Sequence, residues 1–133
     1  GYHLNFVEAK NGRSGEAAGC AYTPFKVQHV PDLEAFAFRA EIGGRVIAYS
    51  GDTALCDALI PLADDADLFV AECSCWTETC GAIHMTPSNI LSLRSRITPK
   101  TKFVLTHMGA GEAPPEIAAA GIVVADDLKT IRL

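Results

Sequence analysis

The feature that most constrains the fold is a change in the hydrophobic pattern near residue 50. Before this point, residues 25–30 and 34–42 alternate apolar and polar side chains, which is typical of half-buried strands. The pair Gly43-Gly44 indicates a tight hairpin turn, and residues 45–50 have the pattern of the returning strand. After this point, short apolar runs alternate with segments of helical spacing. The order predicts two or three antiparallel strands followed by strand–helix units.

The second part of the chain supplies the strand–helix units, and residues 9–16 are polar enough to predict a surface turn before the first strand. We expect further strands at four places: residues 67–73, 102–106, 122–124 and 130–133. We expect helices at three places: residues 53–63, 86–96 and 115–120. The second helix begins with Thr86-Pro87, which has the form of an N-cap followed by proline at the first helical position.

Size and composition bound the architecture and the partners. With 133 residues, 49% of them hydrophobic and 20% charged, the chain can build one packed core, so we expect a single domain over residues 1–133. The net charge of -5 argues against broad binding to nucleic acid phosphates. No apolar run approaches the roughly 18 residues of a membrane span, and the N-terminus lacks a signal-peptide pattern. We therefore expect a cytoplasmic protein that does not contact membranes. The chain also begins without methionine, as a piece excised from a longer protein would.

The cysteines favour a reduced protein. They number five and stand at Cys20, Cys56, Cys73, Cys75 and Cys80. An odd number cannot pair completely within one chain, and no C-x-x-C completes a structural zinc site. We therefore predict reduced, mostly buried thiols of a cytosolic protein. A thiol redox protein that uses Cys73 and Cys75 is an alternative, although a C-x-C pair lacks the helix N-terminal setting that lowers a thiol pKa.

Ionisable side chains stand where several expected strands end. Asp52 and His107 follow two of these strands, and Glu72 closes a third. In open sheets flanked by helices, sites form outside the strand ends, where His29 and His84 could join them. Two histidines and an aspartate have the ligand chemistry of a divalent metal site. A hydrolytic site also needs a proton donor such as His84 and an orienting partner such as Glu72. Alternatively, Asp52 caps the helix from residue 53, and each histidine is a packed residue with one hydrogen bond.

Short motifs in a fixed order carry a resemblance to a known family. They are Val27-Gln28-His29, Ser50-Gly51-Asp52-Thr53, Ala71-Glu72-Cys73, His84-Met85-Thr86 and Leu105-Thr106-His107-Met108. In order and spacing they resemble the second half of a metallo-β-lactamase-fold hydrolase of the ribonuclease Z and cyclic phosphodiesterase branch. The resemblance extends over nearly the whole chain from about residue 20. It implies an α/β (α+β) fold that is the C-terminal half of a four-layer αββα sandwich, with a mixed sheet and helices on one face.

The resemblance also implies a role for each candidate residue. His29 would bind the first zinc ion, Asp52 would bridge the two metals and His107 would bind the second. His84 would protonate the leaving oxygen of a phosphodiester or another small ester, and Glu72 would orient the His84 imidazole. A complete site would hold two zinc ions, with manganese or iron as alternative metals.

The chain departs from the family pattern in one large respect. Family members carry His-x-His-x-Asp-His near the start, which supplies four further ligands, and the four histidines of this chain do not have that spacing. We therefore expect zinc to be absent or weakly bound, and the chain alone to be inactive. The sheet face that normally packs on the missing N-terminal half would be exposed. We expect it to pair with that half or to self-associate.

The hairpin and the charge bear on the substrate. Only residues 42–45 separate the hairpin strands, so the long basic arm of tRNA-processing members has no counterpart, which argues against tRNA as a substrate. A different class of function remains as the alternative, namely a metal-free interaction module that kept the half-fold without catalysis. A His-x-His-x-Asp-His motif encoded upstream would support the hydrolase, and a start codon just before Gly1 would support the module.

Overall fold

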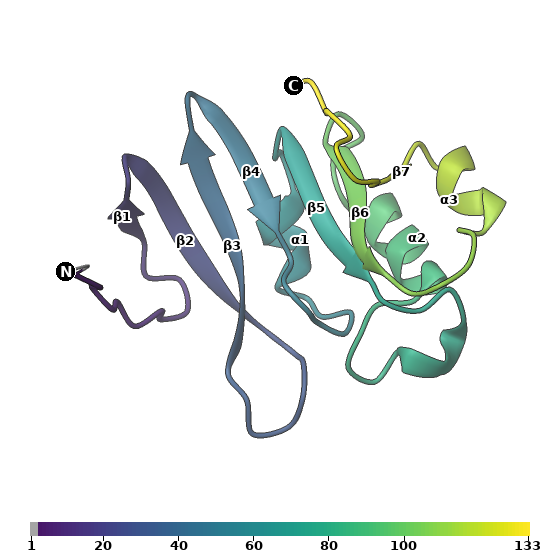
Figure 1. The fold of residues 1–133 in the computed structure, drawn as a ribbon, viewed down its shortest axis with the longest axis horizontal. Coiled ribbons are helices and arrows are strands. Elements are labelled where there is room, and N and C mark those ends of the chain that lie inside the picture. Colours follow the sequence, from purple (N-terminus) through teal and green to yellow (C-terminus); the bar gives the residue numbers. More distant parts are fainter. Residues whose placement is uncertain (1–2) are drawn as a thin grey trace.

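Seven strands form one sheet in the order β1-β2-β3-β4-β5-β6-β7 within residues 3–133, the part of the chain that the computed structural model describes (Figure 1). Their bounds are β1 Gly15–Ala17, β2 Cys20–Val27, β3 Ala35–Ile42, β4 Arg45–Tyr49, β5 Leu68–Cys73, β6 Lys102–Met108 and β7 Val123–Val124. Strands β1 to β4 pair antiparallel, whereas β4 to β7 pair parallel. The predicted change from antiparallel strands to strand–helix units is confirmed and falls between β4 and β5.

Helices α1 and α2 lie against one face of this sheet, and α3 follows β6 (Figure 1). The bounds are α1 Leu59–Ala63, the short 3-10 helix η1 Glu78–Cys80, α2 Pro87–Arg96 and α3 Pro115–Ala119. Helix α2 begins as predicted, because the Thr86 side chain accepts from the Asn89 backbone N–H and the Asn89 side chain accepts from that of Thr86. None of the helices within residues 3–133 combines the length and the apolar character needed to cross a membrane. The predicted mixed sheet with helices on one face is confirmed.

The core lies between the helices and the sheet face that they cover. Ala48, Phe69 and Phe103 stand beside one another on β4, β5 and β6, and the two phenylalanine rings lie 4.8 Å apart. The helices contribute the buried side chains that pack on this face, namely Leu59, Leu62, Ile90, Leu93 and Ile117. Burial of each large apolar side chain stabilises the fold by about 1.5–3 kcal/mol. This packing fixes β4, β5 and β6, and the ends of these strands carry the candidate site.

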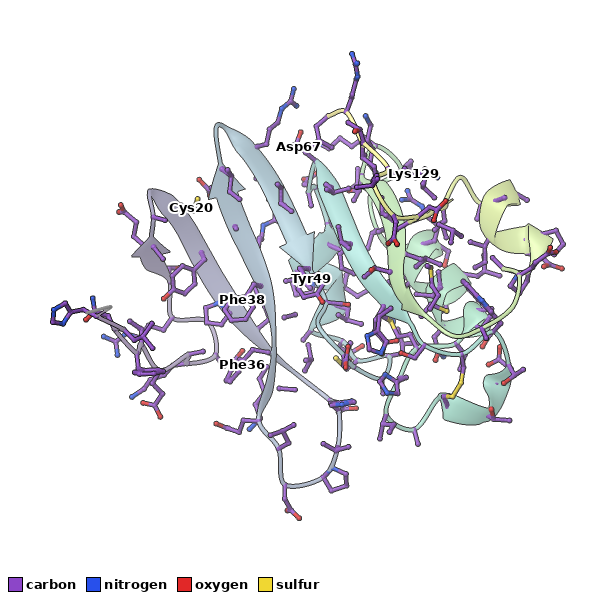
Figure 2. All side chains as sticks on the ribbon, in the orientation of Figure 1. Cys20, Phe36, Phe38, Tyr49, Asp67 and Lys129 are labelled. Carbon is purple, nitrogen blue, oxygen red and sulfur yellow. A yellow bond between two sulfur atoms is a disulfide. The ribbon has the colours of Figure 1, made fainter. Side chains whose placement is uncertain are left out.

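The opposite face of the sheet has no helix over it among the described residues. Phe38 pairs with Tyr49 across β3 and β4, and Phe36 lies two residues before Phe38, so the three rings share this face. In Figure 2 the three rings lie along β3 and β4. Phe38 is 36% exposed and Tyr49 is 46% exposed. An aromatic sheet face of this kind is typical of an interaction surface.

The first two strands depart from the sequence prediction. The segment 9–16, expected as a surface turn, runs into β1, which pairs with the start of β2. Strand β2 begins at Cys20 instead of residue 25, because Pro24 lies inside the strand without breaking its pairing to β3. The Pro24 carbonyl accepts from the Gly12 backbone N–H, on the edge away from β3. The N–H that proline lacks would face the same way, so no β2–β3 hydrogen bond is lost.

The helix predicted over residues 53–63 is shortened to α1. The backbone at the start of this segment makes hydrogen bonds outside the segment: the Thr53 N–H donates to the Glu72 carboxylate, and the Ala54 N–H donates to the Gln28 carbonyl. These bonds hold the segment as a loop against β2 and β5. Asp52 consequently lies too far from the start of α1 to cap it.

The strand predicted over residues 130–133 is wrong. After β7 the chain turns, with the Lys129 N–H donating to the Asp126 carbonyl at 3.1 Å. The residues beyond the turn continue without pairing to the sheet, and the Lys102 ammonium contacts the Arg132 carbonyl. Strand β7 is therefore the edge of the sheet in the described part of the chain.

Candidate functional site

The candidate site lies beyond the C-terminal ends of the strands, on the side of the sheet where β2, β4, β5 and β6 end (Figure 1). Strand β3 runs antiparallel to both β2 and β4, so β2 points in the same direction as the parallel strands. His29 follows β2, Asp52 follows β4, and His107 lies near the end of β6. Glu72 is the next-to-last residue of β5, and His84 comes to this edge from the β5–α2 connection. The structure brings the five candidate residues to the same edge.

His84 lies close to the other two histidines. The centroid of its imidazole ring is 4.9 Å from that of His29 and 5.8 Å from that of His107. Asp52 lies next to His107, with its Oδ1 3.6 Å from Nδ1 of His107. The side chains of His107 and Asp52 are 54% and 37% exposed, so a ligand can reach both.

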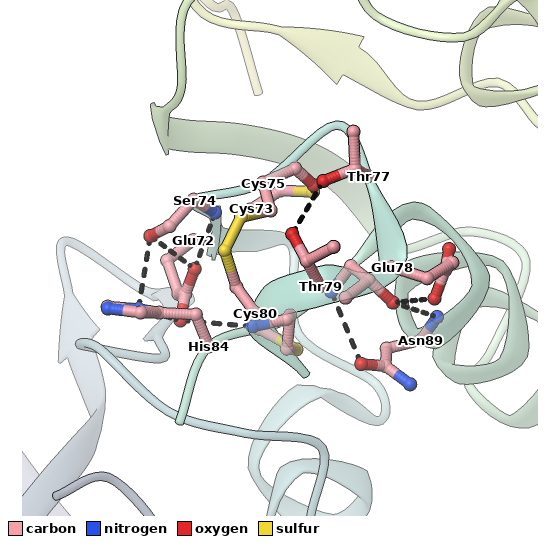
Figure 3. Close-up of a disulfide and its surroundings, with 12 residues drawn as sticks. Glu72, Cys73, Ser74, Cys75, Thr77, Glu78, Thr79, Cys80, His84 and Asn89 are labelled. Carbon is pink, nitrogen blue, oxygen red and sulfur yellow. Dashed lines mark hydrogen bonds and ion pairs between the residues drawn. A yellow bond between two sulfur atoms is a disulfide. The ribbon is translucent and has the colours of Figure 1, made fainter. Parts of the chain in front are cut away.

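Glu72 is the buried anchor of the site, with 1% of its surface exposed. Its Oε1 accepts from the backbone N–H groups of Thr53 at 3.1 Å and Met85 at 3.2 Å, and pairs with Nδ1 of His84 at 2.9 Å. Its Oε2 accepts from the Ser74 backbone N–H at 2.8 Å and from the Ser74 hydroxyl at 2.9 Å (Figure 3). A buried carboxylate needs such donors to offset its lost hydration. Glu72 therefore ties the β4–α1 and β5–α2 connections together and orients the His84 imidazole.

Ser74 belongs to the site although the sequence analysis did not single it out. Its hydroxyl donates to Oε2 of Glu72, which leaves the hydroxyl oxygen free to accept from Nδ1 of His84 at 3.1 Å. Two acceptors thus meet the Nδ1 proton, and Nε2 is the nitrogen left for a substrate. The signal in the sequence is a hydroxyl residue two positions after Glu72 at a strand end, which is too common a pattern to identify a site residue.

Local contacts and backbone geometry orient His29 and His107. Nδ1 of His29 lies 2.9 Å from the Ile83 carbonyl, which can only accept, so Nδ1 donates, and in the neutral ring Nε2 keeps its lone pair. His107 has a φ of 51°, which few residues other than glycine adopt. The β5–β6 register shifts just after Glu72, at the level of His107. This bulge turns the His107 side chain out of the regular alternation of β6.

The donor set fits part of a zinc centre. Imidazole nitrogens and carboxylate oxygens are zinc ligands in proteins, and the hydrogen bond from His29 to a carbonyl is of the kind that orients ligating histidines. Within residues 3–133, no three histidine, cysteine, aspartate or glutamate side chains lie close enough together to hold one metal ion. His29 and His107 are both neighbours of His84. By donor type these residues therefore fit a zinc centre, but the described residues do not complete a three-ligand group.

The β5–α2 connection holds the main correction to the sequence analysis. The prediction of five reduced, mostly buried thiols is wrong, because Cys75 and Cys80 form a disulfide (Figure 3). Helix η1 turns the chain back on itself and brings the two Cα atoms to 6.0 Å, within the usual range for a disulfide. Among the described residues the free cysteines are one buried and two partly exposed residues, namely Cys73, Cys20 and Cys56.

Glu78 fastens the same connection to helix α2. Its carboxylate accepts from the hydroxyls of Thr86 at 2.6 Å and Ser88 at 2.7 Å, and from the Ser88 backbone N–H at 3.2 Å. These bonds, the one from Thr86 first, hold the pKa of Glu78 below its ordinary value. Glu78 therefore stabilises the first turn of α2, which begins three residues after His84.

Acid is expected to release the Glu78 contact. Because the pKa of Glu78 is lower in the folded protein than in the unfolded chain, its contribution to stability is present above the unfolded pKa and lost as the pH falls through the folded pKa. As the pH falls through the lowered pKa of Glu78, protection of the Ser88 amide against hydrogen exchange should fall, after correction for the intrinsic rate. The fall in protection should be smaller in Glu78→Gln than in wild type, and the control Glu112→Gln should show the same fall as wild type. Equal pH dependence in wild type and Glu78→Gln would contradict this interpretation.

The sequence matches the family model described as the beta-lactamase superfamily domain over residues 2–108. Over 142 aligned residues it is 28% identical to the Ribonuclease Z of Methanosarcina acetivorans, and the match covers 96% of this chain and 42% of that protein. The chain therefore spans less than half the length of this curated relative.

Two solved structures resemble the fold. The metallo-beta-lactamase fold protein YhfI from Bacillus subtilis is 20% identical with a TM-score of 0.74, over 90% of this chain and 52% of that one. The Zn(2+)-bound PqqB from Methylobacterium extorquens is 18% identical with a TM-score of 0.69, over 92% of this chain and 54% of that one. At these identities the similarity concerns the fold alone. It confirms that the sheet and its helices correspond to about half of a metallo-β-lactamase αββα sandwich.

Proposed function

Because the chain belongs to the beta-lactamase superfamily, we propose that it supplies part of the active site of a metal-dependent hydrolase that cleaves a phosphodiester or another small ester. The observation that carries the proposal is the meeting of three histidines at one sheet edge, with Asp52 beside one of them and the buried Glu72 beside another. A packed structural histidine needs one hydrogen bond, and a row of three histidines with two carboxylates exceeds that need.

The proposed metals are two zinc ions in a complete site. His29 would hold one ion, His107 the other, and Asp52 would bridge them. Bound zinc supplies a water with a pKa lowered to about 7 and positive charge next to the phosphate oxygens. The proposal is supported by the nitrogen and oxygen donors present and by the free Nε2 of His29. PqqB, whose fold is similar, is a zinc-bound protein.

The proposed proton donor is His84. Glu72 and Ser74 meet its Nδ1, so the imidazole cannot rotate without losing two hydrogen bonds. When the ring carries its second proton, Nε2 can deliver that proton to the leaving oxygen of the ester. Glu72 and Ser74 are positioning residues in this scheme.

The proposed substrate is small. The Ribonuclease Z relative acts on RNA by its name, but the net charge of this chain is -5, which disfavours a long polyanion. The turn between β3 and β4 consists of Gly43 and Gly44, so no arm extends from this hairpin toward a large substrate. We therefore favour a small phosphodiester or ester over tRNA.

The proposed partner is an N-terminal segment outside this sequence, which would cover the aromatic sheet face and supply the remaining zinc ligands. Two observations support it: Phe38 and Tyr49 remain exposed on that face, and the chain spans 42% of its Ribonuclease Z relative. Burying such rings on a partner is favourable, at roughly 25 cal/mol per Å² of apolar surface. Self-association through the same face is the competing outcome and would give a dimer in light scattering of the chain alone.

The test mixes this chain with the separately expressed upstream segment in the presence of zinc. Hydrolysis is followed with bis(p-nitrophenyl) phosphate, with p-nitrophenyl acetate and with a precursor tRNA. We expect the mixture to hydrolyse the phosphodiester or the acetate ester, the tRNA to stay intact, and the chain alone to show no turnover. Turnover by the chain alone, or hydrolysis of no substrate by the zinc-loaded mixture, would contradict the proposal.

A further inference from the structure

The Cys75–Cys80 disulfide closes the connection that presents His84 (Figure 3). Cys75 follows Ser74, whose hydroxyl lies 3.1 Å from Nδ1 of His84. Cys80 lies at the other end of the ring, and its carbonyl accepts from the backbone N–H groups of His84 at 3.1 Å and Ile83 at 3.2 Å. The two bonded cysteines therefore adjoin the groups that hold the His84 side chain and the His84 backbone.

The disulfide ring is short, so its effect is local. Five positions separate the two cysteines, and stabilisation through loop closure grows with the length of the loop. A ring of this size restricts the unfolded chain only slightly. Its main consequence is the conformation of the connection itself, because the sheet and α2 are held by the core and by the cap at Thr86.

We propose that this disulfide is a redox-controlled positioning element: the oxidised pair holds His84 against Glu72 and Ser74, and reduction releases it. In the reduction, a thiolate of a low-molecular-weight dithiol attacks one cystine sulfur, forms a mixed disulfide and displaces the other cysteine as a thiolate. The second thiolate of the dithiol then displaces the first cysteine. The protein gains two electrons and two protons, and the dithiol becomes an intramolecular disulfide.

The pair is accessible to such a reagent, and the neighbouring Cys73 does not compete for it. Cys75 and Cys80 are both partly exposed, and exposed disulfides are the ones that respond to reductants. Burial, followed by the charges of Glu72 and Glu78, raises the pKa of the Cys73 thiol to about 12. At neutral pH Cys73 is therefore protonated and a poor nucleophile. The reduced pair consequently re-forms the same disulfide on oxidation.

The functional consequence rests on the proposed proton-donor role of His84. Hydrogen exchange of backbone amides reports the state of the connection without zinc, substrate or turnover. A failure of this inference is therefore distinguishable from a failure of the proposed function.

The test uses the full 133-residue chain. Two of the five cysteines are in the disulfide, so alkylation of the denatured protein should count three free thiols after treatment with oxidised glutathione and five after dithiothreitol. On reduction, exchange of the Ile83 and His84 amides should accelerate about tenfold or more. The Ile90 amide, which donates to the Thr86 carbonyl in α2, should keep its protection.

Matched variants separate the disulfide from cysteine loss in general. The double variant Cys75→Ser/Cys80→Ser should show the fast exchange without reductant. The double variant Cys20→Ser/Cys56→Ser removes the same number of thiols elsewhere and should exchange like the oxidised wild type. Five free thiols after oxidised glutathione, or an unchanged exchange rate of the His84 amide on reduction, would overturn the inference.

Discussion

Replacing His84 with asparagine is expected to lower kcat of the zinc-loaded, paired protein by about 10²–10⁴-fold, the range for loss of a positioned general acid. Asparagine keeps a polar group next to Glu72 but cannot pass a proton to a leaving oxygen. Zinc content should stay unchanged, because the proposed ligands are His29, Asp52 and His107. The measurement is kcat with a phosphodiester whose leaving group is a poorly acidic alcohol, with zinc determined on the same sample.

His3 offers a matched control for this experiment, because it is an exposed histidine outside the site. His3→Asn should keep both kcat and zinc content. A substrate with a more acidic leaving group should recover part of the activity of His84→Asn, since its leaving oxygen needs less protonation. A kcat of His84→Asn within about twofold of wild type on a poor leaving group would contradict the proton-donor role.

Replacing Glu72 with alanine is expected to lower the free energy of unfolding by about 3–5 kcal/mol, comparable to breaking a buried ion pair. The carboxylate is buried and accepts from Thr53, Ser74 and Met85 as well as pairing with His84. Alanine would leave these donors without acceptors, at about 1–3 kcal/mol for each group that water does not reach. Urea unfolding monitored by tryptophan fluorescence measures the change.

Two variants sharpen this result. Glu72→Gln keeps the shape and one acceptor oxygen but turns an amide NH₂ toward backbone N–H groups, so a smaller loss is expected than with alanine. Glu112→Ala removes an exposed carboxylate outside the site and should change stability by less than about 0.5 kcal/mol. Equal stability of Glu72→Ala and Glu112→Ala would show that the Glu72 hydrogen bonds do not hold the two connections together.

Parts of the fold that depend on neighbours in the sequence could be predicted from it. Gly43 and Gly44 both have positive φ values, 57° and 75°, as the tight turn between β3 and β4 requires. Thr86 caps α2 because its own side chain and that of Asn89 complete the first turn. Strand β1 and the start of β2 were missed, because the tolerance of Pro24 depends on which edge of the strand it faces.

The candidate site divides in the same way. Its histidines and carboxylates stand at strand ends or, for His84, in a motif between β5 and α2, so strand order and resemblance predicted that they lie near one another. The disulfide depends on the return of the chain through η1, which sets the distance between Cys75 and Cys80, and their spacing in the sequence does not fix that distance. The role of Ser74 depends on the same turn of the chain, because the turn through η1 brings His84 back over the end of β5.

The most direct test of the central claim, that this chain holds a share of a two-zinc site, is its zinc content. Inductively coupled plasma mass spectrometry is applied to the chain alone and after mixing with the separately expressed upstream segment. We predict about two equivalents of zinc in the mixture and little in the chain alone, because residues 3–133 complete no three-ligand group. About two tightly bound equivalents in the chain alone, or no zinc in either sample, would contradict the claim. In the second case, His29, Asp52 and His107 would be structural residues of an interaction module.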